Sequence, residues 1–154
     1  FENSFSKKII AFDVFGEFPE AQYELDKERR ELFVKEAGSR SIRKDKLIYI
    51  FKKLNLYQNM ELIEGNILET VPNYKKDNPQ LRISLLHVDV DLYEPTKVCL
   101  REFYPSMVKG GIVILDDYGA FPGANKAIEE YFAEMNVKIR KLPYSHAISF
   151  VEVT

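Results

Sequence analysis

The sequence has a single cysteine, no long apolar run and almost no excess of charge of either sign. Because Cys99 stands alone in 154 residues, an internal disulfide framework is excluded. The net charge of −2, with no basic stripe, argues against broad non-specific binding of nucleic acid. No apolar stretch approaches the roughly 18 residues of a membrane span, and there is no signal-peptide pattern, so we expect a cytoplasmic protein.

The composition is that of a folded protein. A hydrophobic content of 45% and an aromatic content of 13% suit one globular domain with a real core. We therefore expect a single domain over residues 1–154, with a charged helical insert at about 20–55. Within the insert, helical spacing predicts helices over Lys27–Ala37 and Ile42–Leu54.

Two apolar runs in the middle of the chain each end abruptly in aspartate. They are Ile83–Val88, followed by Asp89 and Asp91, and Gly111–Leu115, followed by Asp116 and Asp117. The segment between them has helical spacing, a proline suited to a first turn and a Lys-Gly-Gly stop, which together predict a strand–helix–strand unit. Strands joined in this way run parallel, so the aspartates emerge at one carboxyl edge, where open α/β sheets bind ligands.

Carboxylates gathered at one sheet edge repel each other unless a cation or a proton neutralises them. Three carboxylate oxygens with waters and a substrate oxygen match the octahedral preference of Mg²⁺, and Mn²⁺ or Ca²⁺ suit it less. The ordinary alternative is that Asp is common at strand ends and helix N-caps. The two matched strand ends favour the metal site.

The flanking segments complete an α/β pattern. Strands are predicted at Lys7–Phe12, Met60–Ile63, Val137–Leu142 and Ala147–Val153, the last two as a hairpin, and a helix is predicted at Ala124–Met135. Ile67–Val71 with Pro72 indicates a short helical turn, followed by a polar loop at Asn73–Gln80.

Three single residues in these segments have two interpretations each. Asp13 follows the first strand and either binds ribose hydroxyls or merely begins a turn. His87, inside an apolar strand, is expected in the core, and His146, in the hairpin turn, more often has a solvated than a functional role.

Several motifs appear together in one order. They are FDVFGEFP at 12–19, EGNILETVP at 64–72, VDVDLYEPT at 88–96, Gly110-Gly111 and DDYG at 116–119. From Lys8 to about Tyr131 the chain resembles the macrocin- and mycinamicin-type (TylF/MycF-like) sugar O-methyltransferases. The resemblance implies a Rossmann-like class I methyltransferase sheet of α/β class, mostly parallel with a C-terminal antiparallel hairpin.

The resemblance also implies an activity and a site. The expected reaction is transfer of a methyl group from S-adenosylmethionine, with Mg²⁺, to a hydroxyl of a small-molecule acceptor, a sugar or glycosylated natural product, by a homo-oligomeric enzyme. The metal ligands would be Asp89, Asp116 and Asp117, with Asp89 also taking the proton of the hydroxyl. The cofactor residues would be Asp13 at the ribose and Gly65, Asn66 and Ile67 near the adenine.

One family feature is absent from the 154 residues. Members begin with a strand and a glycine-bearing loop around the methionine part of the cofactor, and no acidic-G-x-G motif is present here. We therefore expect an N-terminally incomplete domain whose sheet lacks its middle strand and exposes apolar edges. The charged stretch Glu20–Asn55 also looks longer than in the family.

Two other classes of function stay open. A non-catalytic domain could keep the fold for binding. Asp89-Val90-Asp91 also fits the D-x-D metal site of a nucleotide-sugar glycosyltransferase, although that interpretation leaves the Gly-Gly pair and the DDYG run unexplained.

Overall fold

The structure is a computed structural model that describes residues 7–144 and 148–154. His146 lies outside the described residues. In chain order the elements are β1 (Ile9–Asp13), α1 (Glu24–Ala37), α2 (Lys44–Lys53), the 3₁₀ turn η1 (Tyr57–Asn59), β2 (Met60–Glu64), α3 (Ile67–Asp77), β3 (Ile83–Val88), α4 (Tyr93–Phe103), the 3₁₀ turn η2 (Tyr104–Ser106), β4 (Met107–Leu115), α5 (Pro122–Phe132), β5 (Arg140–Lys141) and β6 (Ser149–Glu152).

The strands form two sheets. β1 pairs in parallel with β2, and the larger sheet has the order β3-β4-β6-β5. β3 and β4 run parallel with Val88 opposite Leu115, which confirms the predicted crossover through α4. β6 is antiparallel to both β4 and β5, so the predicted closing hairpin is confirmed, although β5 spans only two residues.

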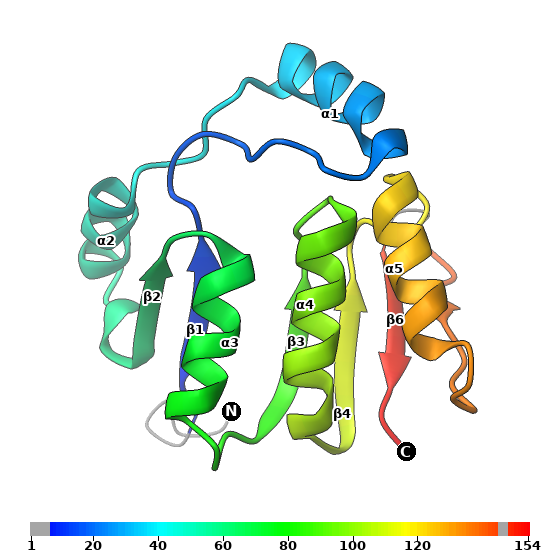
Figure 1. The fold of residues 1–154 in the computed structure, drawn as a ribbon. Coiled ribbons are helices and arrows are strands. Elements are labelled where there is room, and N and C mark those ends of the chain that lie inside the picture. Colours follow the sequence, from blue (N-terminus) through cyan, green and yellow to red (C-terminus); the bar gives the residue numbers. More distant parts are fainter. Residues whose placement is uncertain (1–6, 145–147) are drawn as a thin grey trace.

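A gap separates the two sheets. The edges of β1 and β3 face each other (Figure 1), and no ladder joins them within the described residues. Ile9 on β1 is 57% exposed, and Leu85 is 58% exposed on the face of β3 opposite Leu86 and Val88. Neither of these facing edges is paired with another strand in the described residues, so their backbone N–H and C=O groups are open for pairing.

The core lies between the strands and the helices that cover one face of them, α3 over β1, and α4 and α5 over the larger sheet (Figure 1). Leu86 and Val88 point into it, and Leu100 of α4 is fully buried there. Side chains alternate along a strand, so His87 points the other way and is half exposed. The prediction that His87 belongs to the core is wrong, because no helix in the described ranges covers that face of β3.

The structure also corrects the segment after β2. The predicted short turn and residues 73–77 of the predicted polar loop form one helix, α3, which continues through Pro72 and ends before residues 78–80. Proline removes a helical hydrogen bond, but the packing of this segment favours the helix. Val71 is fully buried, and the Tyr74 ring packs edge-on against Phe12 of β1 at 5.3 Å between centroids.

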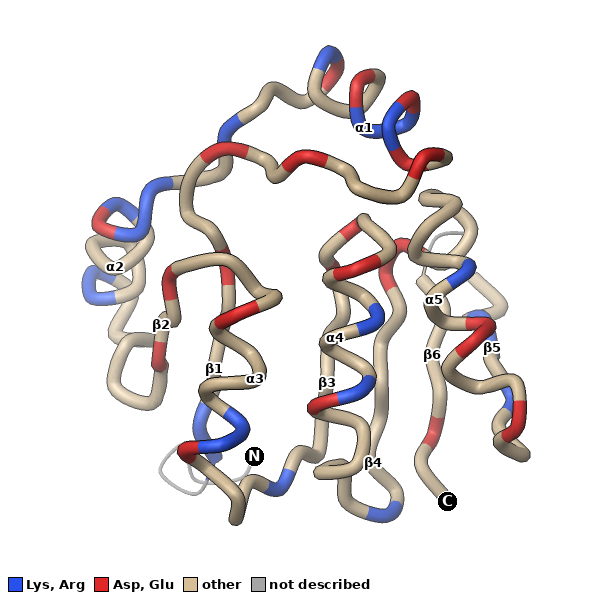
Figure 2. Tube along the Cα trace, viewed as in Figure 1, with Lys and Arg blue, Asp and Glu red and all other residues tan. Residues whose placement is uncertain are grey.

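The charged segment between β1 and β2 folds into the two predicted helices. α1 arches over the carboxyl ends of the strands (Figure 1), and α2 lies beside β2. Figure 2 shows basic and acidic residues interspersed along α1. Of the helices in the described part of the chain, none is long and apolar enough to cross a membrane.

Candidate metal and cofactor site

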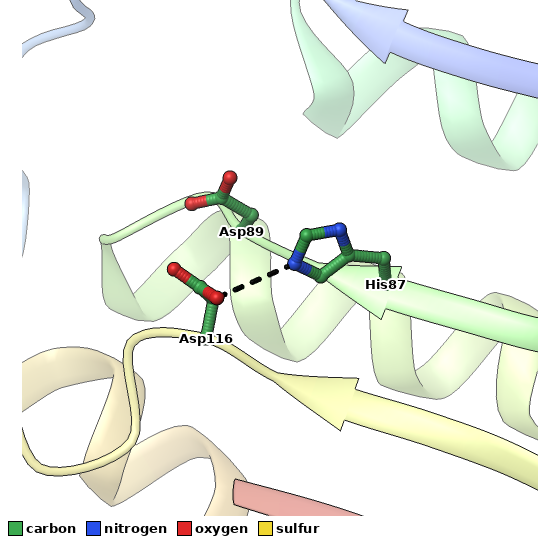
Figure 3. Close-up of side chains that lie close together, drawn as sticks. All are labelled: His87, Asp89 and Asp116. Carbon is green, nitrogen blue, oxygen red and sulfur yellow. Dashed lines mark ion pairs between the residues drawn. The ribbon is translucent and has the colours of Figure 1, made fainter. Parts of the chain in front are cut away.

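Three potential ligands meet where β3 and β4 end. Asp89 and Asp116 follow neighbouring parallel strands, and the Asp116 N–H donates to the Val88 carbonyl at 3.1 Å. His87 joins them from the exposed face of β3 (Figure 3), with its Nε2 3.5 Å from Asp116 Oδ1. One ligand atom from each of the three residues lies within 4.8 Å of the others.

The charges of this cluster are only partly compensated. Burial raises the pKa of Asp89, the charges of Asp117, Asp116 and Asp13 raise it further, and His87 opposes them. Ligand oxygens around an octahedral Mg²⁺ lie roughly 3–4 Å apart, since each bond is about 2.0–2.1 Å. The cluster therefore fits a divalent cation after a small contraction.

Asp117, the third predicted metal ligand, has a different environment. It is only 7% exposed, and its Oδ2 accepts the N–H groups of Val90 at 3.0 Å and Asp91 at 2.8 Å. It stands outside the cluster of His87, Asp89 and Asp116. Asp117 thus fixes the loop that follows β3, because one of its oxygens holds two amides of that loop.

Asp91 is held in that loop in an unusual conformation. Its φ is +60°, a left-handed value that aspartate tolerates better than most residues. Burial raises the pKa of Asp91 to about 8, the nearby Asp117 raises it too, and the Arg29 guanidinium of α1 opposes the shift. A half-buried carboxyl group that holds its proton near neutral pH therefore lies close to the group of His87, Asp89 and Asp116.

The predicted cofactor residues lie at the ends of β1 and β2. Asp13 ends β1, and its Oδ1 accepts the N–H of Phe15 and lies 3.3 Å from Ser41 Oγ. The Gly65 N–H donates to the Asp13 carbonyl at 3.0 Å. A cavity of about 380 Å³ between the start of α2 and the ends of β1 and β2 is lined in part by Phe15, Ile48 and Glu64, and none of the predicted cofactor residues lines it.

Gly65 and Asn66 also have structural reasons to be where they are. Gly65 has a φ of +138°, and a Cβ there would lie 2.9 Å from the Thr70 methyl group. Asn66 caps α3 with its side-chain oxygen, which accepts the N–H of Leu68 at 3.0 Å, and Ile67 is the first residue of α3. The structure thus brings Asp13, Gly65 and Asn66 to one corner of the carboxyl edge.

The parallel strands with acids at their carboxyl ends and the closing antiparallel hairpin match the class I methyltransferase fold of solved structures. The solved calicheamicin methyltransferase CalS11 matches with a TM-score of 0.76 and 28% identity over 98% of this chain and 62% of that chain. The chain belongs to the macrocin O-methyltransferase (TylF) family, whose model matches residues 2–142. The family resemblance predicted from the sequence is confirmed.

Two curated relatives match parts of the chain. Demethyldecarbamoylnovobiocin O-methyltransferase of Streptomyces niveus is 33% identical over 85 residues, 53% of this chain and 32% of the relative. 8-Demethyl-8-(2,3-dimethoxy-alpha-L-rhamnosyl)-tetracenomycin-C 4'-O-methyltransferase of Streptomyces olivaceus is 26% identical over 128 residues, 82% of this chain and 47% of the relative. The chain spans about a third to a half of the length of these relatives. The CalS11 match, at 98% of the chain, includes the charged segment 20–55.

Sequence reasoning missed three residues of this region. His87 was placed in the core, although the alternation of Leu86, His87 and Val88 already puts the imidazole on the opposite face from its neighbours. Asp91 had no assigned role. Asp26 of α1 carried no signal at all, because only the folded chain brings it to the start of α4 and α5.

Proposed function

We propose that this chain carries the metal site and cofactor-binding residues of an S-adenosylmethionine- and Mg²⁺-dependent O-methyltransferase that acts on a hydroxyl of a sugar or glycosylated natural product. Membership of the TylF family and the named activities of the relatives support the reaction class. The observation that carries the site is the convergence of His87, Asp89 and Asp116 within 4.8 Å at the carboxyl edge.

The residues of the cluster have separate proposed tasks. When bound, S-adenosylmethionine supplies an electrophilic methyl group and Mg²⁺ lowers the pKa of an acceptor hydroxyl. Asp89 and Asp116 hold the cation, and Asp117 can add only the oxygen that does not bind the Val90 and Asp91 amides. His87 adds a nitrogen ligand, which suits Mn²⁺ better than Mg²⁺.

Two acidic residues are the proposed acceptors of the proton that leaves the acceptor hydroxyl. Asp89 is the first candidate, because it lies in the cluster that holds the cation. Asp91 is the second, and only above about pH 8, because burial raises its pKa to about 8 and a general base must be ionised before it can accept a proton. Asp91→Asn and Asp89→Asn separate the two roles: loss of transfer with unchanged metal affinity in Asp91→Asn assigns the base to Asp91.

The cofactor is proposed to lie at the corner formed by β1 and β2. Asp13 uses Oδ1 for the Phe15 amide, which leaves Oδ2 for the ribose hydroxyls. Gly65, Asn66 and Ile67 would border the adenine.

Calorimetric titration with S-adenosylhomocysteine, with and without Mg²⁺, tests the proposal in the chain and in any longer natural form of it. We expect binding that Asp13→Asn weakens at least tenfold and that the exposed control Asp77→Asn leaves unchanged. Absence of binding in every form would favour the non-catalytic domain. Mg²⁺-dependent binding of a nucleotide sugar instead of S-adenosylhomocysteine would favour the glycosyltransferase.

A further inference from the structure

α1 has one fully buried residue, and it is an aspartate. Asp26 is 0% exposed, whereas apolar neighbours such as Leu25 (60%) and Leu32 (46%) on the same helix face solvent. A buried carboxylate is costly unless hydrogen bonds satisfy it. The position of Asp26 therefore needs partners outside α1, and both of its oxygens have one.

The two oxygens of Asp26 bind two different helices. Oδ2 accepts the N–H of Tyr93 at 2.9 Å, the first residue of α4, and Oδ1 accepts the N–H of Gly123 at 2.7 Å, the second residue of α5. First-turn amides have no partner within their own helix and mark its positive end. Neither α4 nor α5 has a cap from its own N-cap residue, Leu92 or Phe121. Asp26 supplies the missing cap to both.

Gly123 makes room for this carboxylate. A Cβ at Gly123 would lie 1.9 Å from Asp26 Oδ2, so any larger residue displaces the aspartate. The rest of α1 docks around the same point. The Arg29 Nε donates to the Ala120 carbonyl at 3.3 Å and its guanidinium lies 5.0 Å from the Phe121 ring, and the Phe33 ring packs 5.9 Å from the same ring.

Both capped helices begin immediately after the acid-bearing loops. The loop 89–92 leads from β3 into α4, and the loop 116–121 leads from β4 into α5. Asp117 already ties the two loops through the Val90 and Asp91 amides. Asp26 of α1 adds a second tie between the starts of the two helices.

We propose that Asp26 is a positioning residue, a latch that seats α1 across the carboxyl edge and fixes the two loops that carry the metal-binding aspartates. The inference rests on the proposed function for what the loops bind, but the latch itself is a property of the fold. Loss of the latch frees α1 and widens the spacing of Asp89 and Asp116, so metal affinity falls although Asp26 touches no metal.

The test uses the full chain with Asp26→Ala and with Gly123→Ala, which keeps the carboxylate but displaces it. The exposed Glu31→Gln on the same helix is the matched control. The rate of amide hydrogen exchange at positions 93 and 123 should rise roughly 5- to 30-fold in both latch variants. This is the rise expected when a helix loses the stabilisation of its N-terminal cap. Affinity for Mg²⁺, followed by Mn²⁺ competition, should fall at least threefold in the same two variants. Glu31→Gln should change neither quantity.

The double variant Asp26→Ala with Gly123→Ala distinguishes a latch from two independent sites. Without the carboxylate the new methyl group has nothing to displace, so the double variant should match Asp26→Ala alone. If the effects of the two substitutions on exchange add up in the double variant, Asp26 and Gly123 act independently, which would overturn the latch. Faster exchange with unchanged metal affinity would overturn the positioning role. If the parent chain transfers no methyl group at all, only the proposed reaction is refuted. Faster amide exchange and weaker metal binding in the two latch variants would still uphold the latch.

Discussion

The two consecutive aspartates after β4 should differ sharply in what they do for the fold. Asp117→Ala removes the acceptor of two half-buried amides, those of Val90 and Asp91. Each orphaned amide costs about 1–3 kcal/mol, and part of this is offset because the variant no longer buries a carboxylate. We expect a net loss of about 2–3 kcal/mol. Asp116→Ala should cost less than about 1 kcal/mol, since the Asp116 side chain is 39% exposed and its partner His87 is half exposed.

Urea unfolding in EDTA measures this difference. With an ordinary urea dependence for a chain of this size, the midpoint of Asp117→Ala should fall by about 1–2 M, and that of Asp116→Ala by less than about 0.5 M. Asp117→Asn keeps an oxygen that can accept both amides, so it serves as the control and should stay close to the parent. Equal losses in the two alanine variants, or a larger loss in Asp116→Ala, would refute the division of roles within the pair.

Three further outcomes follow from the surroundings of single residues. Burial raises the pKa of Asp91 to about 8 from an ordinary 3.8, so the folded, metal-free chain holds this proton more tightly than the unfolded chain. The contribution of Asp91 to the free energy of unfolding is therefore complete below about pH 4 and is lost as the pH rises to 8. Melting curves of the parent and of Asp91→Asn at several pH values measure it. The stability difference between the two chains should decline over this range, and an increase would contradict the raised pKa. Burial also raises the pKa of the Cys99 thiol to about 12, so a thiol reagent should modify Cys99 only after unfolding, and rapid labelling of the native chain would disprove its burial. His87→Ala should weaken Mn²⁺ binding several-fold more than Mg²⁺ binding in parallel titrations, because imidazole favours transition metals, and equal losses would remove His87 from the ligand set.

Much of the fold could be predicted because the hydrophobic pattern is local. The apolar runs that end at Asp89 and Asp116, with a helical segment between them, specify a parallel crossover, and parallel strands must place those acids side by side. The same local reasoning failed at α3. Pro72 and the polar residues after it indicate a loop, and only the burial of Val71 against the rest of the core explains why the helix continues.

The site was predictable to the level of the sheet edge and no further. Sequence order cannot distinguish Asp116 from Asp117, because their roles depend on which carboxylate faces the amides of the loop after β3. Nor can it reveal that Asp26, 97 residues before Gly123, meets that glycine. Contacts of this kind arise from the path of α1 over the sheet, which no local pattern encodes.

Transfer of a labelled methyl group from S-adenosylmethionine to a panel of sugar hydroxyl acceptors tests the central claim most directly. The assay is run with Mg²⁺, with EDTA, and with Asp116→Asn, in the chain and in any longer natural form of it. Transfer that requires both Mg²⁺ and Asp116 is the predicted result. Transfer that survives EDTA and Asp116→Asn would contradict a metal-dependent reaction at the carboxyl edge of this sheet.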